Sequence, residues 1–241
     1  MSEKLAYYLL KKVNKAIREH HLIADGDRLA VALSGGKDSL SLLRLLRLRQ
    51  RSARERYDAV AVHVIPAADA PCGKGEDTSA LEAWLQGEDV TYAFVPMEEA
   101  DGQPERRGQS PCFHCAWRRR KAIFLAAERL GCNKVALGHH ADDIAQTTLL
   151  NLFYQGRLET MRPRVEFFSG KLTVVRPLAY VPEKELVRFA AACEFPPPSS
   201  PCANADTSRR ALMAQILRTV EETYPKAKIN LWRAMERAQE R

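Results

Sequence analysis

Six consecutive residues at positions 34–39, Ser-Gly-Gly-Lys-Asp-Ser, carry the kinds of group that bind phosphate. They stand between an apolar run, 28–33, and a stretch with leucine at helical spacing, 38–54. Glycine lets backbone N–H groups approach a phosphate, and a helix N-terminus adds a positive end. An ordinary glycine turn is the alternative, but the added Lys, Asp and Ser favour a nucleotide loop. Its residues are Ser34, Gly35, Gly36, Lys37, Asp38 and Ser39.

This loop differs from the two common nucleotide-binding signatures. Val31 stands where a Walker A loop needs its first glycine, and Asp38 follows the lysine where that loop needs Ser or Thr. The spacing of a G-x-G-x-x-G fingerprint is also missing. In the next apolar run, His63 is a candidate for lying beside the nucleotide, with a buried strand histidine as the alternative reading of the same residue.

A second polar cluster, Leu-Gly-His-His-Ala-Asp-Asp at 137–143, follows another short apolar run. Gly138 permits close backbone approach at a strand end, where ligands collect in open α/β sheets. We expect Asp142 to cap the following helix and Asp143 to hold Mg²⁺ against the phosphates of ATP. His139 and His140 are also of a type that binds zinc, although adjacent residues rarely aim at one metal.

Three cysteines form a candidate metal site. Cys112 and Cys115 make a C-x-x-C pair that precedes a predicted helix, and Cys202 lies in a segment rich in serine and proline. Three thiolates suit a [4Fe–4S] cluster with one open iron, whereas structural zinc prefers four ligands. A redox-active C-x-x-C pair and a simple loop thiol at Cys202 are the other readings. The spacing leaves these alternatives open.

The positions of these motifs follow from alternating strands and helices, which indicate an α/β fold with a parallel sheet and helices on both faces. We predict strands at 28–33, 59–65, 90–95 and 134–137, and helices at 5–21, 38–54, 78–86, 116–130, 142–154, 183–193 and over most of 208–239. The domains we predict are an N-terminal helix at 1–26, a nucleotide-binding domain at 27–181 and a helical C-terminal extension at 182–241.

The composition of the chain indicates which classes of partner the protein binds. The 241 residues carry a net charge of +7, which favours a polyanionic partner such as RNA. No apolar run has the 18 or more residues of a membrane span, and no signal peptide is apparent, so we expect a cytoplasmic protein without a membrane partner. The expected RNA contacts are Arg118, Arg119, Arg120 and Lys121, beside the cysteine pair.

Other residues have weaker claims to an RNA contact. The arginines between 44 and 54 could track an RNA backbone or simply form a solvated helix face. Phe113 and Trp117 have rings that stack on bases, but for Trp117 we expect core packing.

The motifs together resemble the tRNA 2-thiocytidine synthetase family, which belongs to the N-type ATP pyrophosphatases. That family implies the corresponding fold, ATP, Mg²⁺, a [4Fe–4S] cluster on Cys112, Cys115 and Cys202, a tRNA substrate, a cysteine desulfurase as sulfur donor, and a homodimer. The resemblance rests on the motifs at 34–39, the C-x-x-C followed by Arg-Arg, 137–143, 151–156, 176–180 and Pro201-Cys202.

The resemblance also implies a reaction. The C2 oxygen of a cytidine in the anticodon loop is adenylated with release of pyrophosphate, and sulfur then displaces AMP. The related 2-thiouridine enzymes carry further C-x-x-C pairs at both chain ends, which this sequence lacks. It departs from the family at Ala205, where a second cysteine is common, and at 206–208, where Asp-Thr-Ser replaces Gly-Ser-Gln.

Overall fold

The structure is a computed structural model that describes residues 2–68, 70, 77–99, 111–197 and 209–239. Helices and strands alternate along most of the chain. In order, the elements are α1 (Ser2–Glu19), β1 (Arg28–Leu33), α2 (Lys37–Gln50), β2 (Asp58–Ile65), α3 (Ser79–Gly87), β3 (Thr91–Pro96), α4 (Pro111–Arg129), β4 (Lys134–Ala136), α5 (Ala141–Gln155), β5 (Arg164–Phe167), β6 (Leu172–Val175), α6 (Glu183–Ala191), α7 (Arg209–Thr223) and α8 (Ala227–Gln239).

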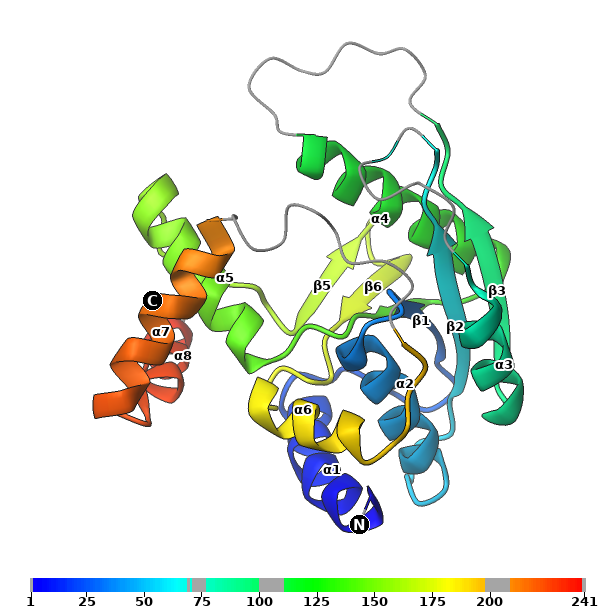
Figure 1. The fold of residues 1–241 in the computed structure, drawn as a ribbon, viewed down its shortest axis with the longest axis horizontal. Coiled ribbons are helices and arrows are strands. Elements are labelled where there is room, and N and C mark those ends of the chain that lie inside the picture. The colour runs from blue at the N-terminus through cyan, green and yellow to red at the C-terminus, as the bar shows by residue number, and fades with distance from the viewer. Residues whose placement is uncertain (1, 69, 71–76, 100–110, 198–208, 240–241) are drawn as a thin grey trace.

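The sheet has the strand order β3-β2-β1-β4-β6-β5 (Figure 1). All neighbours are parallel except β5, which pairs antiparallel with β6 at one edge. The four predicted strands are confirmed, with ends that differ by at most one residue. The short hairpin of β5 and β6 was not predicted from the sequence.

Alternate residues of β1 face two separate hydrophobic cores, as expected for a parallel sheet covered on both faces. Leu29, Val31 and Leu33 pack with side chains of α1, α2, α3 and α6. Ala30 and Ala32 face the other side, where α4 covers the sheet. The predicted α/β class with helices on both faces is therefore confirmed.

The C-terminal helices α7 and α8 pack against each other and against α5, on one side of the molecule (Figure 1). This confirms the predicted helical C-terminal region, although the domain boundaries at 26 and 181 remain predictions. Helix α6 packs on α1 and α2. In the ranges that the structure describes, no helix is both long enough and apolar enough to span a membrane.

The order of the strands places a topological switch point between β1 and β4. From β1, the chain builds β2 and β3 on one side and then adds β4 and β6 on the other. The two connections that leave β1 and β4 therefore diverge, which is the arrangement at which open α/β sheets bind ligands. The loop at 34–39 follows β1 and the cluster at 137–143 follows β4, so topology brings both motifs to this one edge.

Candidate active site at the carboxyl edge

Gly138 allows the end of β4 to approach the start of α2. A Cβ built at Gly138 would lie 3.0 Å from the backbone nitrogen of Ser39 and 3.1 Å from the carbonyl carbon of Asp38. Contacts this short with backbone atoms cannot be relieved by rotating a side chain. Gly138 is therefore required by close packing against the N-terminus of α2, and its expected role beside ATP remains a prediction.

The 34–39 loop has a shape that glycine makes possible. Gly35 has φ of +75°, in the left-handed region, and Gly36 is the N-cap of α2 without a side-chain hydrogen bond to the cap. The first N–H groups of a helix have no intrahelical acceptor, so this end of α2 is suited to an anion.

The two serines fix the form of the loop. The Ser39 hydroxyl donates to the Gly36 carbonyl oxygen at 2.9 Å and accepts from the Ser34 N–H at 3.1 Å. The two hydroxyl oxygens lie 3.2 Å apart. Both hydroxyls thus bond within the loop, and their expected role as phosphate donors remains a prediction.

Lys37 is held by two carboxylates. Its Nζ donates to Asp38 Oδ2 and to Glu183 Oε1, both at 3.1 Å. Burial alone would lower the pKa of Lys37, but the charges of Asp38 and Glu183 outweigh it and raise the pKa. Lys37 thus remains a cation in this half-buried position, and Glu183 connects the loop to the first residue of α6.

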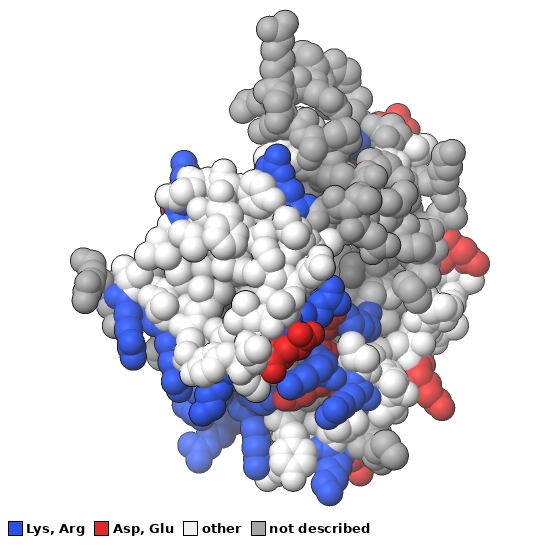
Figure 2. All heavy atoms as spheres, turned by 60° about the vertical axis from the view of Figure 1, so that its left-hand side comes forward, with Lys and Arg blue, Asp and Glu red and all other residues white. Residues whose placement is uncertain are grey.

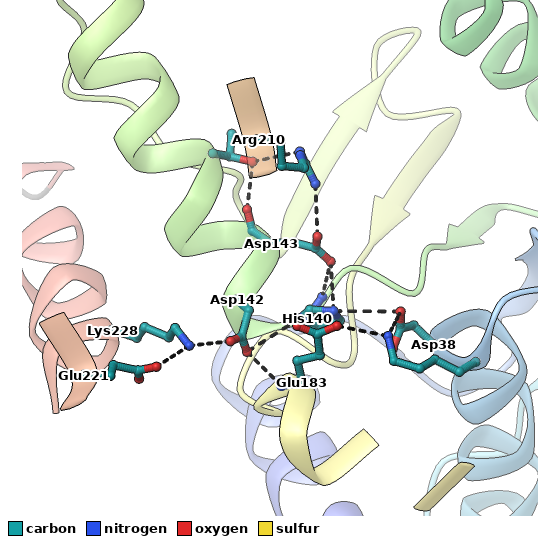
Figure 3. A network of polar contacts seen from close by, with 10 residues as sticks. Asp38, His140, Asp142, Asp143, Glu183, Arg210, Glu221 and Lys228 are labelled. Carbon is teal, nitrogen blue, oxygen red and sulfur yellow. Dashed lines mark hydrogen bonds and ion pairs between the residues drawn. The ribbon is translucent and has the colours of Figure 1, made fainter. Parts of the chain in front are cut away.

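His140 lies at the centre of the cluster and is buried (Figure 3). Its Nε2 is 3.5 Å from Asp143 Oδ2 and 3.8 Å from Asp38 Oδ2, and its Nδ1 is 3.8 Å from Asp142 Oδ2. Burial raises the pKa of Asp38 despite the opposing effects of His140 and Lys37. The Oδ1 of Asp38 is buried and has no hydrogen-bond partner in the described part of the chain.

Asp143 closes the first turn of α5, because its Oδ2 accepts from the His140 N–H at 3.1 Å. Its Oδ1 accepts from Arg210 of α7 at 3.0 Å, and Arg210 also donates to Thr147 at 3.3 Å (Figure 3). The expectation that Asp142 caps α5 is therefore wrong, since Asp143 does so at the N3 position of a capping box.

Asp142 instead serves a different helix. Its Oδ2 accepts from the Glu183 N–H at 2.7 Å, at the start of α6, and its Oδ1 accepts from Lys228 of α8, which also pairs with Glu221. Burial would raise the pKa of Asp142, but the Lys228 and Glu183 donors outweigh it and lower the pKa. One carboxylate thus joins α5, α6 and α8.

Two arginines, Arg120 and Arg176, lie near the cluster of charged residues around His140. Burial, followed by the nearby Arg176 guanidinium, lowers the pKa of His139 to about 4. Burial and the charge of Arg120 lower the pKa of Arg176 to about 10. Arg176 Nε is buried without a hydrogen-bond partner among the residues described. Arg120 of α4 therefore lies within electrostatic range of Arg176, which follows β6 at the carboxyl edge.

His63 lies at the carboxyl end of β2, paired in register with Leu33, the residue before the loop. It is buried, its Nδ1 lies 3.1 Å from the Leu33 carbonyl oxygen, and its ring packs edge-on against Phe94. The histidine is thus beside the loop, in the position of a strand residue in the core.

The C-x-x-C pair lies inside the first turns of α4, which begins at Pro111 and not after the pair as expected. Cys115 is half-buried and not in a disulfide. The side chain of Cys112 and all of Cys202 lie outside the described residues, as do Ala205 and the loop at 100–110. Among the residues described, no group of three His, Cys, Asp or Glu side chains is placed to hold a metal ion.

The predicted RNA-contact residues follow the cysteines on α4. Arg118 Nε donates to the Glu98 carbonyl oxygen at 2.8 Å, and Lys121 donates to the Glu98 carboxylate at 2.6 Å. Arg119 is half-buried, and Arg120 and Lys121 are exposed. Trp117 is 54% exposed, so the expectation of core packing is wrong, and the Lys121 Nζ lies 6.0 Å from its ring centre. Phe113 is also exposed.

Three arginines of α2, which we considered as RNA contacts, have structural partners. Arg49 is buried and donates to Asn14 and Glu55, each at 2.7 Å, so it is neither solvated nor free to bind RNA. Arg44 pairs with Glu88, and Arg47 donates to the Asp89 carbonyl oxygen at 2.7 Å. These contacts stabilise the fold.

Three charged residues of the cluster, Glu183, Arg210 and Lys228, were not predicted from the sequence as part of the site. A glutamate after a proline and a basic residue in a C-terminal helix are common surface features. Only the packing of α6, α7 and α8 brings them to Lys37 and the two aspartates (Figure 3).

Comparison with known proteins gives consistent matches. A family model described as a PP-loop domain matches residues 5–195. The tRNA-cytidine(32) 2-sulfurtransferase of Citrifermentans bemidjiense is 38% identical over 238 residues, which cover 97% of this chain and 91% of that protein. The protein of the same name from Geobacter sulfurreducens is 38% identical over 245 residues, covering 99% and 93%.

A solved structure is similar along the whole chain. The U34-tRNA thiolase NcsA from Methanococcus maripaludis, determined with its [4Fe–4S] cluster, superposes with a TM-score of 0.78. The match covers 100% of this chain and 80% of that chain at 24% sequence identity. This likeness shows that the two chains share a fold.

Proposed function

Because the chain belongs to the PP-loop family and, within it, to the tRNA-cytidine 2-sulfurtransferases, we propose that it thiolates a cytidine in the anticodon loop of tRNA. The C2 oxygen of the base attacks the α-phosphate of ATP and pyrophosphate leaves. Sulfide then attacks C2 and loses its proton, the bond to the adenylated oxygen breaks, and AMP leaves with that oxygen. The curated relatives are named for cytidine 32, which we propose as the target position.

One observation carries this proposal: the N-terminus of α2, which no side chain caps, lies at the carboxyl edge where Asp38 meets the buried His140 and, through it, Asp143. The loop supplies backbone donors, and Lys37 supplies a charge that stays positive at neutral pH. Such preorganised groups stabilise the charge that develops on departing pyrophosphate. When ATP binds, the Lys37 ammonium would leave the Glu183 carboxylate and pair with a phosphate oxygen. One ammonium cannot fully neutralise a carboxylate and a phosphate at the same time.

The acidic side chains fit a divalent cation beside the phosphates. Asp38 has a buried oxygen with no described hydrogen-bond partner, and Asp143 is the neighbouring carboxylate that we predict as a ligand. Carboxylate oxygen is the donor that Mg²⁺ prefers. When bound, the ion would neutralise phosphate charge. His140, between the two aspartates, orients them by contact with both.

The cysteines fit the [4Fe–4S] cluster by their chemistry and place. Residues 112 and 115 are three apart in α4 and therefore lie on one helix face, and the side chain of Cys115 is half-buried. We propose Cys202 as the third ligand. When bound, the cluster would supply an open iron site for sulfur, with a cysteine desulfurase as donor. A homodimer and a cytoplasmic location complete the proposal.

The tRNA would enter between α4 and the carboxyl edge. Burial and the charge of Arg120 in α4 lower the pKa of Arg176 at the carboxyl edge. Helix α4 also carries two exposed aromatic rings, those of Phe113 and Trp117. Cations bind the phosphates of RNA, and aromatic rings stack on unpaired bases. The basic stretch Arg118–Lys121 therefore stays our proposal for the RNA contact nearest the chemistry.

The decisive experiment measures thiolated nucleosides in tRNA from a strain that lacks this gene. We expect 2-thiocytidine to be lost and to return with the wild-type gene but not with Cys112→Ala. Cys193→Ala, which removes a half-buried free thiol elsewhere, is the matched control and should restore it. Loss of a different thionucleoside would contradict the proposed base, and an unchanged profile would contradict tRNA thiolation.

A further inference from the structure

The outer face of α1 carries a stripe of basic and aromatic side chains outside the site already described. Its members recur at the three- and four-residue spacing that places side chains on one face of a helix. Tyr7 is 58% exposed and Tyr8 is 51% exposed. All six members are exposed, and they are Lys4, Tyr7, Tyr8, Lys11, Lys15 and Arg18.

The opposite face of α1 is buried against the rest of the protein. Leu9, Val13, Ala16 and Ile17 are buried in the core that α1 shares with α2 and α6. An amphipathic helix that binds a membrane inserts its apolar face, and that face is not available here. The stripe is therefore the solvent-exposed, polar face of a helix that is held in place by its buried face.

The cations and rings of the stripe are already arranged together. Lys11 Nζ lies 4.5 Å from the ring centre of Tyr7 and 5.5 Å from that of Tyr8. Lys15 has one carboxylate nearby, Glu19 at 3.9 Å, an exposed pair worth little. The four cations thus retain most of their charge for a partner.

The stripe is one helix away from the catalytic edge. Helix α1 packs against α6, and Glu183 at the start of α6 pairs with Lys37. Figure 1 shows α1 at the bottom of the molecule beside α6. Figure 2 shows Lys and Arg side chains over the lower part of the turned view, mostly on its left, with Asp and Glu side chains among them towards the centre and right.

We propose that the α1 stripe is a docking surface for the sugar–phosphate backbone of tRNA, away from the reacting base. This inference rests on the proposed function, because tRNA is the substrate assumed there. Lys4, Lys11, Lys15 and Arg18 run along about 21 Å of helix and displace counterions from successive phosphates. Tyr7 and Tyr8 pack against ribose or an unpaired base.

The test compares two variants of the full chain with the same loss of charge. The stripe variant carries Lys4→Gln, Lys11→Gln, Lys15→Gln and Arg18→Gln. The control carries Arg218→Gln, Lys226→Gln, Arg233→Gln and Arg237→Gln, four exposed residues of α7, α8 and the turn between them. Binding of bulk tRNA is measured by fluorescence anisotropy over a range of salt concentrations, and thermal unfolding confirms that each variant folds.

We expect the stripe variant to lose affinity about tenfold or more at moderate salt and to reduce the salt slope by about 2 to 4. The control should keep the wild-type affinity within about twofold. Tyr7→Ala with Tyr8→Ala should weaken binding about fivefold without changing the salt slope.

Equal losses of tRNA affinity in the two quadruple variants would show that the effect comes from net charge alone, and would overturn the proposal. Unchanged tRNA affinity in the stripe variant would overturn it as well. If that variant instead lost binding to anionic vesicles, the stripe would be a membrane-binding surface and the proposal would be wrong. A wild-type chain that binds tRNA while the nucleoside profile of the deletion strain is unchanged would contradict the proposed function but leave the docking surface standing.

Discussion

At the carboxyl edge of the sheet, charged side chains from α2, α5, α6, α7 and α8 pair with one another, whereas the chemistry at the start of α4 comes from neighbours in sequence. Lys37, Asp142 and Asp143 each contact a residue from a distant element. Cys112, Phe113, Cys115 and Trp117 share two turns of one helix. The first region depends on the assembled fold, and the second depends mainly on local spacing.

This difference predicts that the two regions can be disabled separately. Substitutions at the edge should alter ATP chemistry and, where they break a cross-helix pair, stability. Substitutions at the start of α4 should alter sulfur transfer and leave the fold unchanged, because Phe113 and Trp117 are exposed and Cys115 is half-buried.

The largest expected effect is that of Lys37→Ala. Loss of its charge should slow tRNA-dependent pyrophosphate release by about 100-fold or more, the scale for removing one preorganised stabilising group. Lys12→Ala is the matched control, because Lys12 also bridges to α6, through Glu185, outside the edge. A rate for Lys37→Ala within a fewfold of wild type would remove Lys37 from the chemistry.

The contrasting variant in α4 is Cys115→Ala. We expect it to form no detectable 2-thiocytidine and to bind ATP with unchanged affinity, since Cys115 lies outside the phosphate loop and is proposed as a cluster ligand. Iron content and nucleoside analysis measure the first effect, and calorimetry measures the second. Equal loss of ATP binding would show that the two regions are not separable.

Asp142→Asn tests whether the edge stabilises the fold. The folded-state pKa of Asp142 is below its ordinary value of 3.8, so its stabilisation is complete above that value and is lost as pH falls through the folded pKa. At pH 7 the variant should lose ~2 kcal/mol of unfolding free energy, the scale of a charge-assisted hydrogen bond. Urea unfolding should show this difference shrink once the pH falls below 3.8. A difference that persists in acid would assign the loss to packing.

The smallest effect is expected for Glu183→Gln. It removes a competing partner of Lys37, so ATP should bind a fewfold more tightly, in keeping with the modest strength of exposed ion pairs. Glu185→Gln makes the same charge change two residues along α6 and should leave the affinity unchanged. Weaker ATP binding in Glu183→Gln would instead assign Glu183 a direct role in the nucleotide site.

The parts of the molecule that were predictable are those encoded by neighbouring residues. The apolar run at 28–33 followed by two glycines and a lysine predicts a strand, a phosphate loop and a helix, and the strand and the helix are present on either side of the loop. Strand β5 has only four residues, which are half-buried or exposed, and so it gives no clear pattern. Trp117 was assigned to the core from its residue type, because the sequence does not show which face of α4 meets the sheet.

The relations between distant elements were not predictable. Asp142 and Asp143 are equal candidates to cap α5 in the sequence, and the choice is made by the Glu183 N–H, which arrives from the start of α6. Arg210 and Lys228 reach the aspartates only because α7 and α8 pack on α5. Long-range packing therefore decides which of several similar charges take part in the site.

The contact between Lys228 and Asp142 also has a consequence for the order of folding during synthesis. Every strand of the sheet precedes α8 in the chain, so the nascent protein can assemble its sheet while Asp142 still lacks its ammonium partner. The charge pairing at the edge is completed only when α8 leaves the ribosome and docks. The charge network at the carboxyl edge would then be completed after the sheet itself has been synthesised.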